Sequence, residues 1–162
     1  MRLLRRLAVT TALSAVVVGM GPAMGGAAPE NPPLFRDVAA PPSTPPPAAP
    51  RIVRSRYVAV DFDALGGAQP TPATAPSSVV LNLFPDATFT AQRDSVQPTP
   101  AGGGIIWTGH LQGVPNSAVT LVAEDGVLVG NVEADGRYYE VRYAGDGLHT
   151  VAETTPRAFG PD

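Results

Sequence analysis

Few side chains in this sequence have the chemistry of a catalytic or metal-binding group. The chain contains two histidines, His110 and His149, and no cysteine, which excludes disulfides, thiolate metal sites and a thiol nucleophile. The zinc-binding His-Glu-x-x-His motif is absent. His149 and Glu153 are four residues apart, but the residues around them predict a strand. There the two side chains would lie about 13 Å apart along the axis, so they cannot chelate one metal ion locally.

Two further candidates for chemistry are His110 and Ser117. His110 could act as a zinc ligand, but its position at the end of a predicted strand favours a hydrogen-bonded structural histidine. Ser117 follows Asn116 in a predicted turn, and the chain has no Gly-x-Ser-x-Gly segment that would expose a nucleophile. The sequence therefore predicts no catalytic residue, and we expect the protein not to be an enzyme.

The acidic and glycine-rich segments do not form a recognisable ion or phosphate site. Asp61, Asp63 and Asp86 offer the oxygen ligands that Ca²⁺ prefers, but their spacing matches no calcium loop. The run Gly102 to Gly104 lacks the lysine and the helix that follow a phosphate-binding loop, and it predicts a flexible connection. No metal ligand and no cofactor is predicted.

The N-terminus predicts export. Residues 1–28 read as a signal peptide, with a basic start, an apolar run from Leu7 to Met20 and a zone of small residues. We expect cleavage after Gly25 or Ala27. The alternative of a membrane anchor is disfavoured because the apolar run is shorter than the roughly 20 residues that span a bilayer. We therefore expect a secreted, periplasmic or extracellular protein without stable membrane insertion after cleavage.

The charge of the exported chain argues against nucleic-acid binding. Removal of the signal peptide takes away Arg2, Arg5 and Arg6, which leaves 11 − 3 = 8 basic residues against 14 acidic residues, a net charge of −6. An acidic chain is repelled by a phosphate backbone. We expect no nucleic-acid partner.

Composition divides the rest of the chain into a linker, one domain and a tail. Residues 29–50 are rich in proline and poor in large apolar side chains, which predicts a disordered linker of extended polyproline II character. Residues 51–155 contain short apolar runs separated by turn residues, which predicts one all-β domain. Residues 156–162 form a predicted C-terminal tail.

We expect a small antiparallel meander or sandwich of about seven to eight strands. Asp-Gly pairs at 125–126, 135–136 and 146–147 separate the last four predicted strands, and such pairs favour tight hairpin turns. Alternation predicts Tyr139, Val141 and Tyr143 on the buried face, opposite Tyr138. Trp107 is predicted as a core residue. The predicted strands span residues 53–62, 79–84, 87–95, 104–111, 118–123, 127–133, 137–143 and 148–153.

Four segments resemble the propeptide region of bacterial reprolysin-like zinc metalloproteases. They are residues 81–86 (LNLFPD), 107–115 (WTGHLQGVP), 125–130 (DGVLVG) and 143–149 (YAGDGLH), and the similarity covers residues 51 to 153. The resemblance implies a β-rich domain that assists folding of a zinc metalloprotease catalytic domain or keeps it latent. This chain lacks the zinc-binding half and any propeptide cysteine, so inhibition would use other contacts. His110 and residues 154–162 would be the first to test.

Two functions follow as hypotheses. The first is a non-catalytic pro-domain-like module that binds a zinc metalloprotease domain, in trans or as part of a truncated precursor. The alternative is an independent extracellular β-sandwich that binds a polysaccharide or another cell-envelope partner. An exposed aromatic side chain on a flat face, such as Tyr138 or Trp107, would favour the alternative.

Overall fold

The computed structural model of the chain describes residues 31–38 and 51–155. The predicted signal peptide, most of the predicted linker and the C-terminal tail lie outside these residues. The described residues contain nine strands and one short 3-10 helix: β1 (Phe35–Asp37), β2 (Ile52–Val60), η1 (Phe62–Leu65), β3 (Ser78–Phe84), β4 (Ala87–Pro98), β5 (Gly104–Leu111), β6 (Ala118–Glu124), β7 (Val127–Ala134), β8 (Arg137–Gly145) and β9 (Leu148–Thr154).

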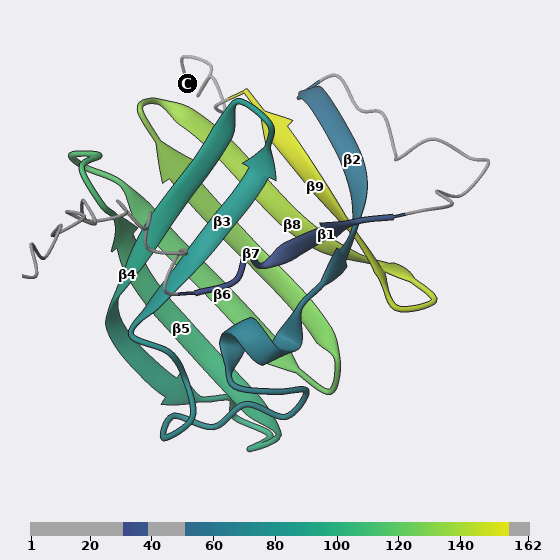
Figure 1. Cartoon of the computed structure of the whole chain (residues 1–162), viewed down its shortest axis with the longest axis vertical. Coiled ribbons are helices and arrows are strands. Elements are labelled where there is room, and N and C mark those ends of the chain that lie inside the picture. Colours follow the sequence, from purple (N-terminus) through teal and green to yellow (C-terminus); the bar gives the residue numbers. More distant parts are fainter. Residues whose placement is uncertain (1–30, 39–50, 156–162) are drawn as a thin grey trace, which may run out of the picture.

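All nine strands belong to one antiparallel sheet in the order β1-β2-β9-β8-β7-β6-β5-β4-β3. The sheet curls until its two ends nearly meet, and an isolated parallel bridge between Pro33 and Val80 links the residues just before β1 to β3 (Figure 1). The predicted all-β antiparallel class is confirmed. The architecture is a single, nearly closed sheet around one core.

The last four strands form the predicted ladder of hairpins. Each Asp-Gly turn has both residues at positive φ, for example 48° at Asp125 and 74° at Gly126. This conformation matches the right-handed twist of the flanking strands, and glycine adopts it without steric cost. The turns thereby fix the register of β6 to β9.

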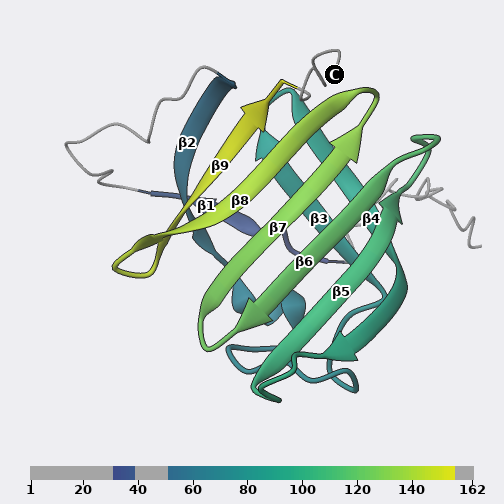
Figure 2. The ribbon, with the colours of Figure 1, turned by 180° about the vertical axis from the view of Figure 1, so that it is seen from behind.

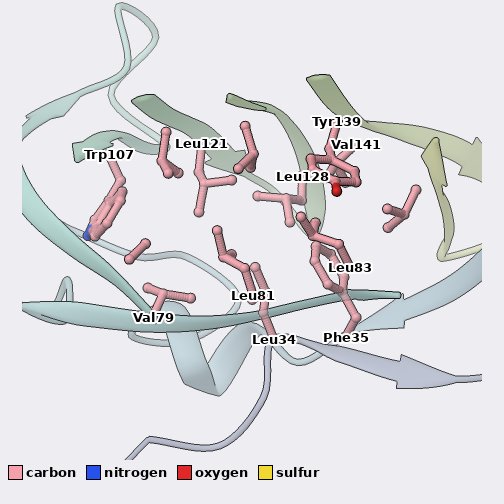
Figure 3. Close-up of a cluster of buried hydrophobic side chains, with 14 of the residues drawn as sticks. Leu34, Phe35, Val79, Leu81, Leu83, Trp107, Leu121, Leu128, Tyr139 and Val141 are labelled. Carbon is pink, nitrogen blue, oxygen red and sulfur yellow. The ribbon is translucent and has the colours of Figure 1, made fainter. Parts of the chain in front are cut away.

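The core fills the inside of the curled sheet. Figure 3 shows side chains of β3 and of the segment around β1 facing side chains of β5 to β8. Trp107 and Tyr139 are among the largest buried side chains, and the indole Nε1 of Trp107 donates to the Pro76 carbonyl at 3.1 Å. Burial of Trp107, Tyr139 and Val141 confirms those predictions. Tyr143 is 44% exposed, contrary to prediction: it lies near the β8–β9 turn, where its ring packs against His149 but is only partly covered.

Strand β1 lies in the segment predicted to be linker. Leu34 and Phe35 are 0% and 2% exposed and belong to the core. They are the one pair of adjacent large apolar residues in residues 29–50. The remaining predicted linker, residues 39–50, lies outside the described residues.

The short helix η1 connects β2 to the loop before β3. The Asp61 carboxylate caps its N-terminus by accepting from the Asp63 N–H, and Gly66 ends it at φ 100°. Leu65 is fully buried, which fastens the helix to the core. Among the residues that the structure describes, no helix is both long and apolar enough to cross a membrane.

Candidate functional site

The histidine and glutamate considered as a metal pair are kept apart by the fold. His149 points into the core and is 0% exposed, with Nε2 accepting from the Leu128 N–H at 3.0 Å. Glu153 accepts from Arg54 at 2.6 Å, and its side chain is 13% exposed. Both residues therefore have structural partners, and they do not form a common site.

His110 is an exposed residue with a carboxylate partner. Its Nδ1 lies 2.7 Å from an oxygen of Asp94, and both side chains are more than half exposed. Asp94 reaches it because the β4–β5 register shifts between Arg93 and Ser95, which leaves Asp94 at the bulge. The hydrogen bond agrees with the interpretation of His110 as a structural histidine.

The remaining sequence candidates serve the fold. Ser117 accepts from the Leu111 N–H and donates to the Val114 carbonyl, so its hydroxyl fastens a turn. Asp61 pairs with Arg36, and Asp86 with Arg54, in different parts of the sheet. No group of three or more metal-ligating side chains occurs in residues 31–38 and 51–155.

The structure instead reveals a depression on the outer face of β6, β7 and β8. Figure 2 shows these strands side by side across the back of the molecule. Cross-strand pairing aligns Thr120 with Asn131 and Asn131 with Glu140, which forms a polar row across the three strands. These side chains point outward because their strand neighbours, such as Leu121 and Tyr139, point into the core.

Two adjoining hollows, which share this polar row, make up what we call the outer groove. The larger has a volume of about 530 Å³ and the smaller about 250 Å³. The larger hollow extends to Arg51, Thr154 and Thr155, where the described chain ends; the smaller is bordered by Val129 and Arg142. Because the two hollows adjoin on the open outer face of β6 to β8, the groove suits an extended ligand.

Polar pairs hold the walls of the outer groove. The Tyr138 hydroxyl donates to Glu133 at 3.0 Å, and this hydrogen bond raises the pKa of Tyr138 above its ordinary value. Arg142 donates to Glu140 at 2.6 Å. Tyr138 is 36% exposed and Val129 is 41% exposed, so the groove also offers apolar surface. Hydroxyl, amide and carboxylate groups beside an exposed ring can bind a polar ligand that has apolar faces.

Among the described side chains that line the groove, no hydroxyl group is hydrogen-bonded to a free base that could activate it as a nucleophile. Each carboxylate of the walls is engaged by a neighbour, Glu133 by Tyr138 and Glu140 by Arg142. Two guanidinium groups, of Arg51 and Arg142, balance these two carboxylates. The arrangement suits reversible binding of an uncharged ligand.

The sequence analysis had named Tyr138, as a possible exposed aromatic, and the segment that begins with Thr154 and Thr155, as a possible contact of a protease. The other groove residues were missed because each alone is an ordinary polar residue of a strand. Their signal was the outward alternation of polar residues on three successive hairpin strands. Pairing register, which places Thr120, Asn131 and Glu140 in one row, emerges only from the folded sheet.

The segments behind the propeptide resemblance contribute mainly core and turn residues. Leu81, Leu83 and Trp107 are buried, and Gly126 and Gly147 occupy left-handed turn positions. Comparison of the chain with protein-family models, curated proteins and solved structures finds no match. The resemblance therefore rests on these four segments alone. Their residues mainly form the core and the turns, so the resemblance says more about the fold than about a surface that binds a partner.

Proposed function

We propose that this protein is a non-catalytic binding module, exported from the cell, that holds an extended uncharged polysaccharide in the outer groove. The observation that carries the proposal is the exposed ring of Tyr138 beside a row of hydroxyl, amide and carboxylate groups. Sugars present apolar faces that pack on aromatic rings, and hydroxyl groups that exchange hydrogen bonds with such side chains.

The charge of the groove supports an uncharged ligand over a polyanion. Glu133 and Glu140 are balanced by Arg51 and Arg142, and the exported chain would carry a formal charge of 8 − 14 = −6. A polyanion would meet repulsion from the protein and no excess of cations in the groove. Neutral hydroxyl-rich polymers meet neither obstacle.

The proposal is tested by co-sedimentation of the purified protein with three insoluble uncharged polysaccharides: chitin, cellulose and a β-1,3-glucan. We expect retention by at least one of these polymers and weaker retention of the Tyr138→Ala variant. The Tyr57→Ala variant removes another partly exposed tyrosine, which lies on β2 and does not line the groove, and serves as the matched control. Release of reducing ends during the incubation would contradict a non-catalytic role. Failure of all polymers to retain the folded protein would overturn the proposal.

The second candidate is a pro-domain-like module that binds a zinc metalloprotease domain. It is favoured by the four similar segments and by the position of Thr154 and Thr155 at one end of the outer groove, beside the start of the C-terminal segment. Titration of a reprolysin-like catalytic domain, with its zinc content monitored, tests this role. Saturable inhibition that Tyr138→Ala weakens would select this candidate over a polysaccharide, whereas no binding or effect on refolding would exclude it.

A further inference from the structure

A short segment of the chain lies between strands β2 and β3 and joins the two ends of the sheet. We call residues 31–38 the strap. Strand β1 of the strap pairs with β2 through three residues, Phe35 with Val60 to Asp37 with Val58, and the strap touches β3 by the bridge at Pro33. Figure 1 shows it lying between β2 and β3. The seam between these strands is therefore filled by a separate segment.

At the centre of the strap, the backbone N–H and carbonyl groups of Leu34 and Phe35 all have hydrogen-bond partners in the seam. The Leu34 N–H donates to the Val80 carbonyl at 2.9 Å, and the Leu34 carbonyl accepts from the Asp61 N–H at 2.8 Å. The side-chain amide of Asn82 accepts from the Phe35 N–H at 2.9 Å and donates to the Phe35 carbonyl at 2.6 Å. Asn82 thus takes the place of a paired strand residue.

Side-chain contacts hold the strap at both ends and anchor it in the core. Asn31 donates to the carbonyl and hydroxyl of Ser78, at 3.0 and 2.7 Å. Arg56 donates to Asp37 at 2.7 Å near the other end. Leu34 and Phe35 insert their side chains into the core between these polar contacts. The seam therefore recognises both the sequence and the backbone of the strap.

All these partners lie in residues 51–155, so the acceptor and the strap come from two separate stretches of chain. Fourteen residues, 38–51, connect Asp37 to Ile52. Asp37 lies opposite Val58, six residues along β2 from Ile52, a span of about 20 Å. A proline-rich chain of fourteen residues reaches up to about 40 Å when extended. The connection is long enough for the strap to reach a neighbouring molecule.

We propose that the seam is a strand-acceptor site that takes the strap of a second copy of the chain, so that two copies exchange straps and form a dimer. The contacts inside the seam are the same in the monomer and in the exchanged dimer. The balance between them is therefore set by the connecting residues and by protein concentration. The strap and the seam contain no residue of the outer groove, and the exchange is argued independently of the proposed function.

Disulfide trapping tests the exchange, because the natural chain has no cysteine. Arg36 lies directly opposite Ala59 in the β1–β2 ladder. The single variants Arg36→Cys and Ala59→Cys are mixed at high protein concentration, unfolded and refolded together, and oxidised. The control mixture pairs Arg36→Cys with Val53→Cys, an exposed residue that does not pair with β1. We expect at least about fivefold more disulfide-linked heterodimer from the first mixture than from the control, increasing with concentration.

The double variant Arg36→Cys with Ala59→Cys provides the positive control in a dilute sample. It should form an intramolecular disulfide while keeping the buried-tryptophan fluorescence of Trp107. Equal heterodimer yields from the two mixtures, with the intramolecular bond present, would overturn the exchange. A folded double variant that forms no disulfide would overturn the placement of the strap itself.

Discussion

The imidazole of His149 replaces a strand as the partner of the Leu128 backbone N–H. Its Nε2 atom accepts from this N–H at 3.0 Å. The β7–β8 ladder ends at the pair Gly130 and Val141, so the next N–H along β7 that faces β8 has no strand partner there. An accepting Nε2 requires the neutral imidazole with its proton on Nδ1. His149 is thereby a structural histidine whose protonation would break the hydrogen bond.

The first prediction concerns pH. Burial lowers the pKa of His149 below its ordinary value of 6.5, opposed in part by the Gly147 backbone. The unfolded chain therefore binds more protons than the folded chain between the two pKa values. The contribution of His149 to stability is complete above about pH 6.5 and is lost as the pH falls toward the folded-state pKa, by at most about 1.4 kcal/mol per pH unit.

Urea unfolding followed by Trp107 fluorescence, from about pH 8 to about pH 5, measures this dependence. Carboxylates also lower stability in acid, so His149→Gln is the reference. The fall in stability below pH 6.5 should be steeper in the natural protein than in the variant. Parallel pH profiles would show that His149 does not contribute.

A second prediction separates the hydrogen bond from the packing of His149. The His149→Leu variant fills similar space but leaves the Leu128 N–H without an acceptor, which should cost about 1 to 3 kcal/mol. The side-chain oxygen of His149→Gln can reach the position of Nε2 and should retain a larger part of the stability at pH 8. Hydrogen exchange of the Leu128 amide should accelerate most in the leucine variant. Equal exchange in both variants would contradict this role.

A third prediction concerns Asn82, whose amide binds the backbone of Phe35. The Asn82→Ala variant leaves an N–H and a carbonyl without partners and should lower the free energy of unfolding by about 1 to 3 kcal/mol or more. Asn82→Asp keeps an acceptor for the Phe35 N–H but places a second acceptor oxygen against the Phe35 carbonyl, so it should also lose stability. Asn131→Ala, at an exposed position of the outer groove, should change stability by less than about 0.5 kcal/mol. Urea midpoints that do not differ among the three variants would refute the closure of the seam by Asn82.

A fourth prediction concerns Gly109, which lies against the backbone of β4. A Cβ atom there would lie 2.0 Å from the Gln92 carbonyl oxygen and 2.7 Å from the Trp107 ring. The Gly109→Ala variant should therefore lose about 1 to 3 kcal/mol or more, because neither neighbour can move freely. Gly103→Ala is the control, since its Cβ would meet side-chain atoms alone, the nearest being a carboxylate oxygen of Glu124 at 3.1 Å. Thermal unfolding compares the variants, and similar midpoints would contradict the close approach.

The sequence allowed the eight strands of the domain to be predicted because local signals agree. Alternation marked the strands, and the Asp-Gly turns fixed the hairpins between them. The buried position of Trp107 followed from its neighbours Ile105 and Leu111, which share its face. Strand β1 could not be predicted in the same way, because three residues between proline-rich stretches carry no periodicity.

Features that depend on contacts between residues far apart in the chain could not be predicted from the sequence. Asn82 lies 47 residues from Phe35, and only the curled sheet brings the amide to that backbone. The burial of His149 depends on Phe62 and Tyr143, whose rings pack edge-on against it. The outer groove likewise requires the register of three strands. That the protein is not an enzyme remains a prediction from the sequence. The assay for release of reducing ends, described above, tests it.

The binding role of the outer groove is tested most directly by nuclear magnetic resonance titration of the protein with a soluble oligosaccharide of whichever polymer retains it. We expect saturable shifts of the Thr120, Asn131 and Tyr138 amides. Tyr138→Ala should weaken binding about two- to tenfold or more through loss of ring packing, whereas Tyr138→Phe should retain most of it. Saturable shifts confined to other surfaces, or equal affinity of the alanine variant, would contradict the account.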